Sequence, residues 1–341
     1  MRTILETIDS KYVIMNDIGC GATCSVYKGY SLEDKSKKLY AIKIFKEKAK
    51  KYFDKEILIN KYLPSEYFLS IYKYGTGRIH QELDNSENIS TSHNINSLDN
   101  YNGVIYYIIQ ELAQNGELFN YVYKIEEGFP ENISIKIFKK IVECVKILHD
   151  NRIAHCDIKP ENVLVGNDFS IKLIDFGFSQ ILENDDNFIY EYRGSDMYAS
   201  PEIQNKNMNG YDALKSDIFS LGVLLFVITV RRFPFERPGY IDRKYRLIMN
   251  KKYNDFWCFY QQYNLSNEFK DLINHLICYD PSERLTIDEI LEHPIMKKYT
   301  NKNNENNNNL NENVIMSISD FDEEVVDELE NRKAIINMKE S

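Results

Sequence analysis

The sequence predicts an α+β protein in which a strand-rich part comes first and a helix-rich part follows. Residues 11–48 show the alternating pattern and glycine breaks of half-buried strands. From Leu118 onward the apolar spacing is mostly helical. Strands followed by helices, rather than strands alternating with helices, are typical of α+β proteins.

Within the first part, one helix and one insertion interrupt the strands. Apolar side chains recur at helical spacing in residues 49–62, and Pro64 ends this helix. Residues 76–103 are rich in Asn, Ser, Asp and Glu and have few apolar side chains, so we expect a disordered insertion there. The segments with strand character are 12–14, 26–29, 39–45, 68–75 and 104–112.

The second part contains four predicted helices. Residues 133–150 place apolar side chains on one face, as a helix at the edge of a core does. Residues 217–229 are apolar on nearly all sides, which is typical of a buried core helix. Shorter helices are expected near 266–278 and 286–292.

The end of the chain changes character after Tyr299. Residues 301–313 are an asparagine-rich linker by composition, and 318–337 could form an acidic amphipathic helix. The sequence therefore predicts one domain over residues 12–299 and a tail over 300–341. The domain divides into a first lobe, about 12–112, and a second lobe, about 113–299.

Composition excludes some classes of function. The net charge is −10, whereas a nucleic-acid binder is expected to be basic. The longest apolar run, 221–230, is too short to span a bilayer, so we expect no membrane partner. The six cysteines lack metal-ligand spacing and read as reduced thiols, which places the protein inside the cell, in the cytoplasm or nucleus.

Two short motifs contain the side chains that phosphoryl transfer needs. Residues 155–162 read His-Cys-Asp-Ile-Lys-Pro-Glu-Asn, and Asp175 begins an Asp-Phe-Gly triplet. Phosphoryl transfer requires neutralisation of phosphate charge and positioning of the attacking hydroxyl. Asp157 is the candidate base, Lys159 can neutralise the phosphate, and Asn162 and Asp175 offer oxygen ligands to magnesium.

These motifs resemble the catalytic and metal loops of eukaryotic serine/threonine protein kinases, except that Cys156 replaces an arginine. The resemblance implies a bilobal kinase fold: a small antiparallel sheet with one key helix, then a larger, mainly helical lobe. It also implies ATP, Mg²⁺ (with Mn²⁺ as an alternative) and protein substrates. Residues 114–119 are similar to the calmodulin-dependent and AMP-activated kinase group.

The nucleotide-binding residues follow from the same resemblance. Residues 18–26 look like a glycine-rich loop whose third glycine is replaced by Cys24. Lys43, in Tyr-Ala-Ile-Lys, resembles the kinase lysine that pairs with a helix glutamate, here Glu56, and faces the phosphates. The implied ATP-site residues are Ile18, Gly19, Gly21, Val26, Ala41, Lys43, Glu111, Ala113, Glu117 and Leu164.

Further motifs extend the resemblance into the second lobe. Residues 194–202 look like the end of an activation segment, in which Ser195 would bridge Asp157 and Lys159. The resemblance also implies a structural Glu202–Arg284 ion pair and an Asp217 carboxylate that fixes the catalytic loop. Glu117 and Glu161 either recognise a basic residue upstream of the phosphoacceptor or are solvated surface acids.

Cys156 points to unusual regulation. In many kinases the arginine at this place binds a phosphate on the activation loop. Here that arginine is missing, and residues 180–194 contain no serine or threonine. We therefore expect no switching by loop serine/threonine phosphorylation, with Glu191 as a fixed negative charge. Tyr190 and Tyr192 remain as alternative phosphorylation sites.

Other readings stay open. Asn60 is polar where kinases usually have an apolar residue packing toward Phe176, so a partner or the 314–337 tail could dock on the first-lobe helix. The tail could equally be an acidic disordered segment. A pseudokinase scaffold and a small-molecule phosphotransferase are the rival functions, and the intact Asp157 and Asp175 argue against the first.

Overall fold

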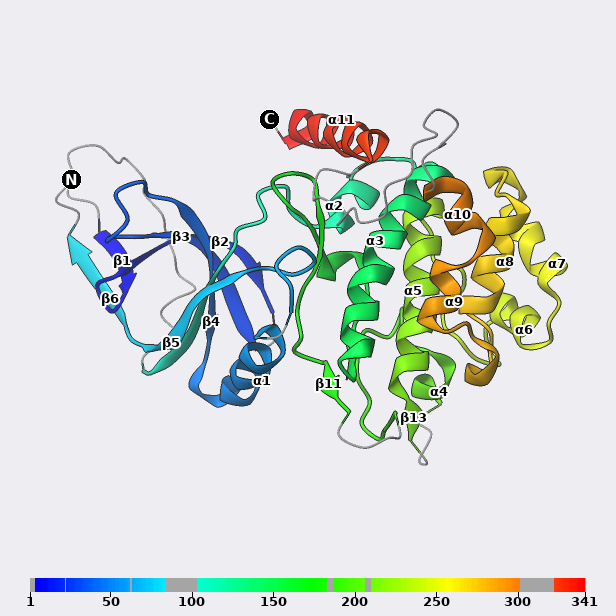
Figure 1. Cartoon of the computed structure of the whole chain (residues 1–341), viewed down its shortest axis with the longest axis horizontal. Helices are drawn as coiled ribbons and strands as arrows, with labels where there is room; N and C mark the ends of the chain where they lie inside the picture. The colour runs from blue at the N-terminus through cyan, green and yellow to red at the C-terminus, as the bar shows by residue number, and fades with distance from the viewer. Residues whose placement is uncertain are drawn as a thin grey trace, which may run out of the picture. The chain divides into compact units, whose positions relative to one another are not determined.

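The computed structural model describes residues 4–21, 23–61, 63–83, 103–182, 187–205, 210–300 and 322–340. The chain forms two compact units (Figure 1). The strand-rich unit comprises Met1–Gln114 and Asp175–Gly177, and the helical unit comprises Asn115–Ile174 and Phe178–Ser341. The α+β prediction is confirmed, because strands dominate the first unit and helices the second.

The strand-rich unit is built on one seven-stranded antiparallel sheet with the order β5-β7-β4-β3-β2-β1-β6. Strands β5 and β6 lie at opposite edges, yet only Arg78 separates them along the chain. The sheet must therefore curl strongly, as Figure 1 shows. The strands are β1 Ile4–Ile8, β2 Tyr12–Cys20, β3 Cys24–Ser31, β4 Leu39–Phe45, β5 Ile71–Gly77, β6 Ile79–Leu83 and β7 Ile105–Gln110.

Two features of this unit differ from the sequence prediction. Strand β1 was not expected, and β6 lies inside the segment predicted to be a disordered insertion. The two strands pair with each other over their full length, from Ile4↔Leu83 to Ile8↔Ile79. A pairing between segments so distant in sequence leaves no local signal. Residues 84–102 of the predicted insertion lie outside the described residues.

The helical unit is organised around α5, Ala213–Val230. Asp212 caps its first turn by accepting the N–H of Lys215, and Arg231 ends it in the left-handed region at φ 57°. By length and composition α5 could cross a membrane, but 89% of it is buried inside the protein, as in a core helix. Packing against it is α3, Glu131–Asp150, whose apolar face was predicted.

Shorter elements surround these two helices. Predicted helices near 266–278 and 286–292 are confirmed as α8, Asn267–Leu276, and α9, Ile287–Leu291. The other elements are α2 Leu118–Tyr123, β8 Ile153–Ala154, β9 Val163–Val165, β10 Ile171–Leu173, β11 Gln180–Ile181, β12 Phe188–Ile189, α4 Pro201–Gln204, β13 Tyr211–Asp212, α6 Arg243–Met249, α7 Tyr253–Trp257 and α10 Pro294–Thr300.

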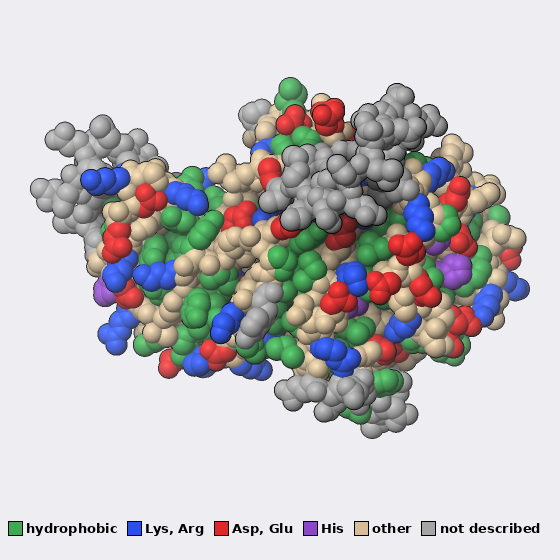
Figure 2. All heavy atoms as spheres, viewed as in Figure 1, with side chains coloured by type: hydrophobic (Ala, Val, Ile, Leu, Met, Phe, Trp, Pro, Cys, Tyr) green, Lys and Arg blue, Asp and Glu red, His purple; other side chains and the backbone are tan. Residues whose placement is uncertain are grey.

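The tail forms a helix, α11, Glu323–Glu340. It contacts α2 and α3 within the helical unit (Figure 1). The sequence suggested that the tail or a separate partner docks on the first-lobe helix, now α1, Lys50–Asn60. The buried face of α11 instead packs within the helical unit, and docking of a partner on α1 stays a prediction. On the face drawn in Figure 2, acidic and basic side chains are interspersed, without a broad basic surface among the described residues.

Candidate functional site

In the strand-rich unit, a buried ion pair joins β4 to α1. Lys43 Nζ lies 2.6 Å from Glu56 Oε2, and the two side chains are only 8% and 6% exposed. Helix α1 begins at Lys50, which places Glu56 almost two turns into the helix, on its buried side. The predicted Lys43–Glu56 pair is therefore present, and its burial makes the lysine ammonium a fixed charge.

The electrostatics of this pair keep Lys43 charged. Burial alone would lower the pKa of Lys43, but the carboxylates of Glu56 and Asp175 outweigh it and raise that pKa above its usual value. Nearby, burial raises the pKa of the Cys24 thiol to about 11, so this cysteine stays protonated at neutral pH. Cys24 therefore acts as a small apolar side chain beside the ammonium.

The Asp-Phe-Gly triplet belongs to the same unit. Asp175 has φ 67° and accepts the N–H of Gly177 at 3.1 Å, while its Oδ1 lies 3.8 Å from Lys43 Nζ. Phe176 is buried, with its ring 6.0 Å from that of Phe68. The exposed part of the Asp175 carboxylate, 43% of the side chain, is an oxygen surface suited to a hard cation.

Asn60 was expected to weaken the packing of α1. Its amide instead donates to the Glu56 carbonyl at 3.3 Å, within the same helix. Since Phe68 contacts the Phe176 ring, an aromatic residue outside α1 supplies the packing for this phenylalanine.

The predicted nucleotide residues of this unit share one face of the sheet. Val26 on β3 pairs with Lys43 on β4, and Ala41 lies two residues from Lys43 on the same strand. Paired residues and residues two apart point to the same side, so these three side chains face one way. Gly19 lies on β2, paired with Val26, and Gly21 lies in the β2–β3 turn, where its N–H donates to the Cys24 carbonyl.

The other predicted nucleotide residues lie on other strands or just after them. Ile18 on β2 is 42% exposed, and Glu111, just after β7, donates its N–H to the Ser70 carbonyl. Ala113 follows without regular structure. Leu164 of β9 belongs to the helical unit, where it bridges to Glu117.

In the helical unit, Asp157 is the centre of a polar cluster. Ser195 Oγ donates to Asp157 Oδ1 at 2.8 Å and accepts from Lys159 Nζ at 2.7 Å, which is the bridge that the sequence predicted. Lys159 Nζ also lies 2.9 Å from Asp157 Oδ2. Asn162 Nδ2 donates to the carbonyl and carboxylate of Asp157 at 2.7 and 2.9 Å. With its nitrogen so committed, the Asn162 amide presents its oxygen as the atom for a hard cation.

The backbone that carries Asp157 is held from α5. The buried Asp217 carboxylate accepts the N–H groups of His155 and Cys156, both at 2.8 Å. His149 lies 3.0 Å from the same carboxylate. Cys156 has φ 63°, a left-handed conformation that these bonds help to maintain. The predicted role of Asp217 thus agrees with the geometry.

Glu117 and Glu161 form an acidic pair beside this cluster. Glu117 is the residue before α2, and Glu161 lies in the tight turn Pro160–Asn162. Burial, followed by repulsion from Glu161, raises the pKa of Glu117. Glu161 Oε2 is buried and accepts no hydrogen bond from the described residues. A buried carboxylate oxygen without a donor is costly, so the pair is suited to receive a cation.

Cys156 packs at the edge of an apolar cluster. That cluster contains Leu182 and Ile189 of the segment that follows the Asp-Phe-Gly triplet, together with Tyr211 of β13. Polar contacts hold the same segment. Tyr211 donates to the Glu191 carbonyl at 3.0 Å, and Arg193, which pairs with Glu191, donates to the Phe178 carbonyl at 3.1 Å.

The Glu202–Arg284 ion pair anchors the end of the segment. Arg284 is buried and donates to both Glu202 oxygens, at 2.6 and 2.7 Å. A bidentate guanidinium–carboxylate pair fixes direction as well as distance. It therefore holds α4, which begins at Pro201, against the helical core.

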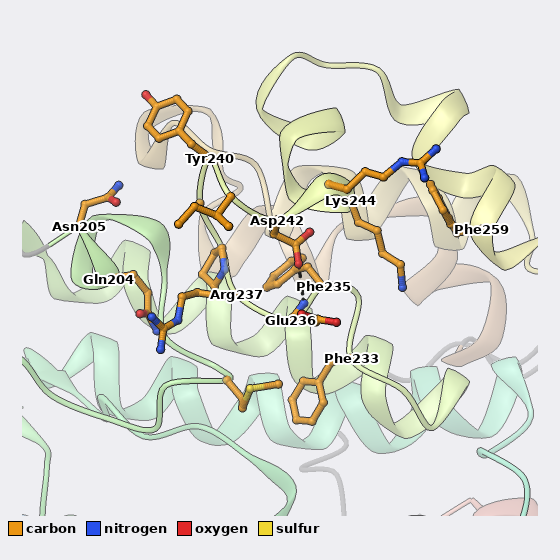
Figure 3. A pocket seen from close by; sticks show the side chains of 15 residues that line it. Gln204, Asn205, Phe233, Phe235, Glu236, Arg237, Tyr240, Asp242, Lys244 and Phe259 are labelled. Atoms are coloured by element: carbon orange, nitrogen blue, oxygen red, sulfur yellow. Dashed lines mark hydrogen bonds between the residues drawn. The ribbon is translucent and has the colours of Figure 1, made fainter.

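A hollow of about 790 Å³ lies beside α4 (Figure 3). Its lining includes Met197, Gln204 and most of residues 233–244, where Ile241 is 98% exposed. Asp242 shapes the loop by accepting the N–H of Glu236 at 2.8 Å. None of the 15 lining residues is a predicted catalytic or nucleotide residue, and the sequence did not indicate this hollow.

Comparison with known proteins gives a consistent match. The family described as protein kinase domain matches residues 12–296. The serine/threonine-protein kinase GIN4 of Saccharomyces cerevisiae is 35% identical over 196 residues, which is 57% of this chain and 16% of the relative. PLK4 of Drosophila melanogaster is 28% identical over 301 residues, covering 88% of this chain and 35% of the relative. The chain thus aligns with about a third or less of these relatives' lengths.

Proposed function

The chain belongs to the protein kinase domain family, and we propose that it transfers the γ-phosphoryl group of ATP to serine or threonine hydroxyls of proteins. The observation on which this rests most is the cluster of Asp157, Lys159, Asn162 and Ser195. A protein kinase needs a carboxylate that orients the acceptor hydroxyl and a cation next to it. The relatives, also named serine/threonine-protein kinases, support the same acceptor class.

We assign ATP binding to the face of the sheet that carries Val26, Ala41 and Lys43. Lys43, held charged by Glu56, would attract the α- and β-phosphates. Asn162 and Asp175 would hold Mg²⁺ through oxygen atoms, and the ion would neutralise phosphate charge when bound. Asp157 would accept a hydrogen bond from the substrate hydroxyl, while Lys159 would balance the charge that develops on the transferred group.

We also propose that the preferred substrates carry a basic residue upstream of the phosphoacceptor. The unsatisfied Glu161 oxygen and the repulsion between Glu161 and Glu117 support this, because an arginine would relieve both. Similarity to the calmodulin-dependent and AMP-activated kinase group, based on residues 114–119, belongs to the same proposal.

The activation segment supports activity without loop serine/threonine phosphorylation. Packing of Cys156 with Leu182 and Ile189 takes the place of an arginine–phosphate contact. Arg193 then ties the segment to the Phe178 carbonyl, with Glu191 as its fixed counter-charge. In the described residues 178–182 and 187–194 these contacts involve protein groups alone, which supports the proposal that this part of the segment needs no phosphate to hold it.

An intracellular location, in the cytoplasm or nucleus, is part of the proposal. It is supported by the cysteines, all six of which are free thiols.

An arrayed peptide library with radiolabelled ATP and Mg²⁺ tests the function. We expect labelling of serine and threonine peptides, strongest where arginine precedes the acceptor, and loss of labelling in Asp157→Asn. A wild-type protein that labels no peptide, with Mg²⁺ or with Mn²⁺, would instead favour the pseudokinase scaffold.

A further inference from the structure

The tail helix α11 lies outside the part of the chain that matches the kinase family, yet it is built into the helical unit. The family match ends at residue 296, and α11 covers Glu323–Glu340. Its buried residues are Val325, Leu329, Arg332 and Ile336, a spacing that puts them on one helical face. Three are apolar, and the fourth is an arginine that is 5% exposed.

Arg332 is hydrogen-bonded to α2 and to the loop that follows it. Its guanidinium donates to the carbonyls of Tyr121, Glu127 and Gly128 at 3.0, 2.9 and 2.8 Å. Glu328, one turn earlier on α11, accepts from its Nε at 2.7 Å. The guanidinium also lies 4.0 Å from the centre of the Phe129 ring. A buried arginine with this many hydrogen-bond partners is an integral part of the packing between α11 and the helical unit.

Of the three carbonyls that accept from Arg332, one belongs to α2 and two to the loop after it, and this segment cannot stabilise itself. Helix α2 has six residues, too few to be stable alone, and the carbonyls of its last turn lack intrahelical donors. Arg231, at the end of α5, donates to the Val122, Tyr123 and Glu126 carbonyls. Arg231 and Arg332 therefore bind different carbonyls within residues 121–128, and Arg332 belongs to the tail.

A second contact reaches the start of the same element. Lys333 Nζ donates to Asn115 Oδ1, and Asn115 Nδ2 donates to the Gly166 carbonyl at 2.6 Å. Glu117 follows two residues later as the residue before α2. Arg332 and Lys333 thus fix the end and the beginning of the short segment that carries Glu117.

We propose that α11 is a working part of the substrate site, and that Arg332 is a positioning residue that sets Glu117 for recognition of a basic substrate residue. This rests on the proposed function, in which Glu117 and Glu161 receive that residue. The tail then acts through α2, and Arg332 does not contact the substrate itself.

The test uses the full chain and two synthetic peptides, one with arginine upstream of the serine and one with alanine there. Arg332→Met should raise KM for the arginine peptide about tenfold, with kcat and the alanine peptide little changed. Arg332→Lys should restore part of the affinity. Glu330→Gln removes one exposed charge from the same helix and should change KM less than about twofold.

The double variant Glu117→Gln/Arg332→Met separates positioning from general destabilisation. If Arg332 acts through Glu117, its effect on KM should vanish once Glu117 is neutral. A tenfold effect that persists in Glu117→Gln, or an equal loss for both peptides, overturns the proposal. If Arg332→Met does not fold, Lys333→Met decides, with a smaller rise for the arginine peptide only. No effect of Glu117→Gln itself would refute the acidic-pair proposal instead.

Discussion

Restoring the arginine that kinases usually carry before the catalytic aspartate should damage this protein. Cys156 borders the apolar cluster of Leu182, Ile189 and Tyr211, and no serine or threonine between 180 and 194 can be phosphorylated to meet a guanidinium. Glu191, the acidic residue expected to supply a fixed negative charge, already pairs with Arg193. Cys156→Arg would therefore force a larger, charged side chain toward an apolar surface.

The magnitude follows from two costs. Overpacking a well-packed cluster costs about 1–3 kcal/mol, and a buried charge without a partner costs several kcal/mol more. Since Cys156 is only half-buried, part of the guanidinium stays hydrated, so we expect a loss of about 2–4 kcal/mol in the free energy of unfolding. Cys156→Ala, which has the same backbone requirement, should lose no more than about 1 kcal/mol.

Urea unfolding and peptide phosphorylation measured on the same preparations check this. Cys156→Arg should show a lower urea midpoint at an unchanged m-value, together with reduced kcat, and Cys156→Ala should stay close to wild type in both. An arginine variant as stable as wild type, or more active, would refute the argument that apolar packing replaces the phosphate contact.

Three further results are expected. Glu202→Gln should cost about 3–5 kcal/mol in urea unfolding, because it strands the buried Arg284 charge, and a cost below about 1 kcal/mol would contradict this. Lys43→Met should lower kcat/KM about 100-fold or more by removing a fixed cation, so near-normal turnover would exclude its role. Preference for arginine over alanine peptides should fall as the pH is lowered below neutrality, because burial and repulsion from Glu161 raise the pKa of Glu117 and it becomes protonated at a higher pH than an ordinary glutamate. The same acid dependence in Glu117→Gln would show that Glu117 does not attract the arginine.

Residues that are close in sequence, or that belong to a known motif, could be predicted. The cluster from Asp157 to Asn162 spans one short loop, so its side chains are close together in the sequence, and the family motif indicated their roles. Lys43 and Glu56 come from neighbouring elements, and their pairing was implied by the resemblance of residues 40–43 and the following helix to kinases. The Ser195 bridge was also predicted, through the motif of residues 194–202.

Contacts between distant segments could not be predicted where no family motif indicated them. Strands β1 and β6 pair across more than 60 residues, with only short runs of alternating side chains to indicate either strand. Arg332 was missed for a different reason: its partners are backbone carbonyls, which every residue carries, so no sequence pattern distinguishes them. A regularly spaced apolar stripe in 318–337 indicated a helix but not the surface that it covers.

The central claim is that the chain is a serine/threonine kinase that works without phosphate on its activation segment. The most direct test is the rate of phosphorylation of an arginine-containing serine peptide by phosphatase-treated protein, with Asp157→Asn as the background. We expect the treated wild type to keep its rate and Asp157→Asn to lose it. A rate that collapses after phosphatase treatment, with the lost phosphate mapped to residues 178–200, would contradict the claim.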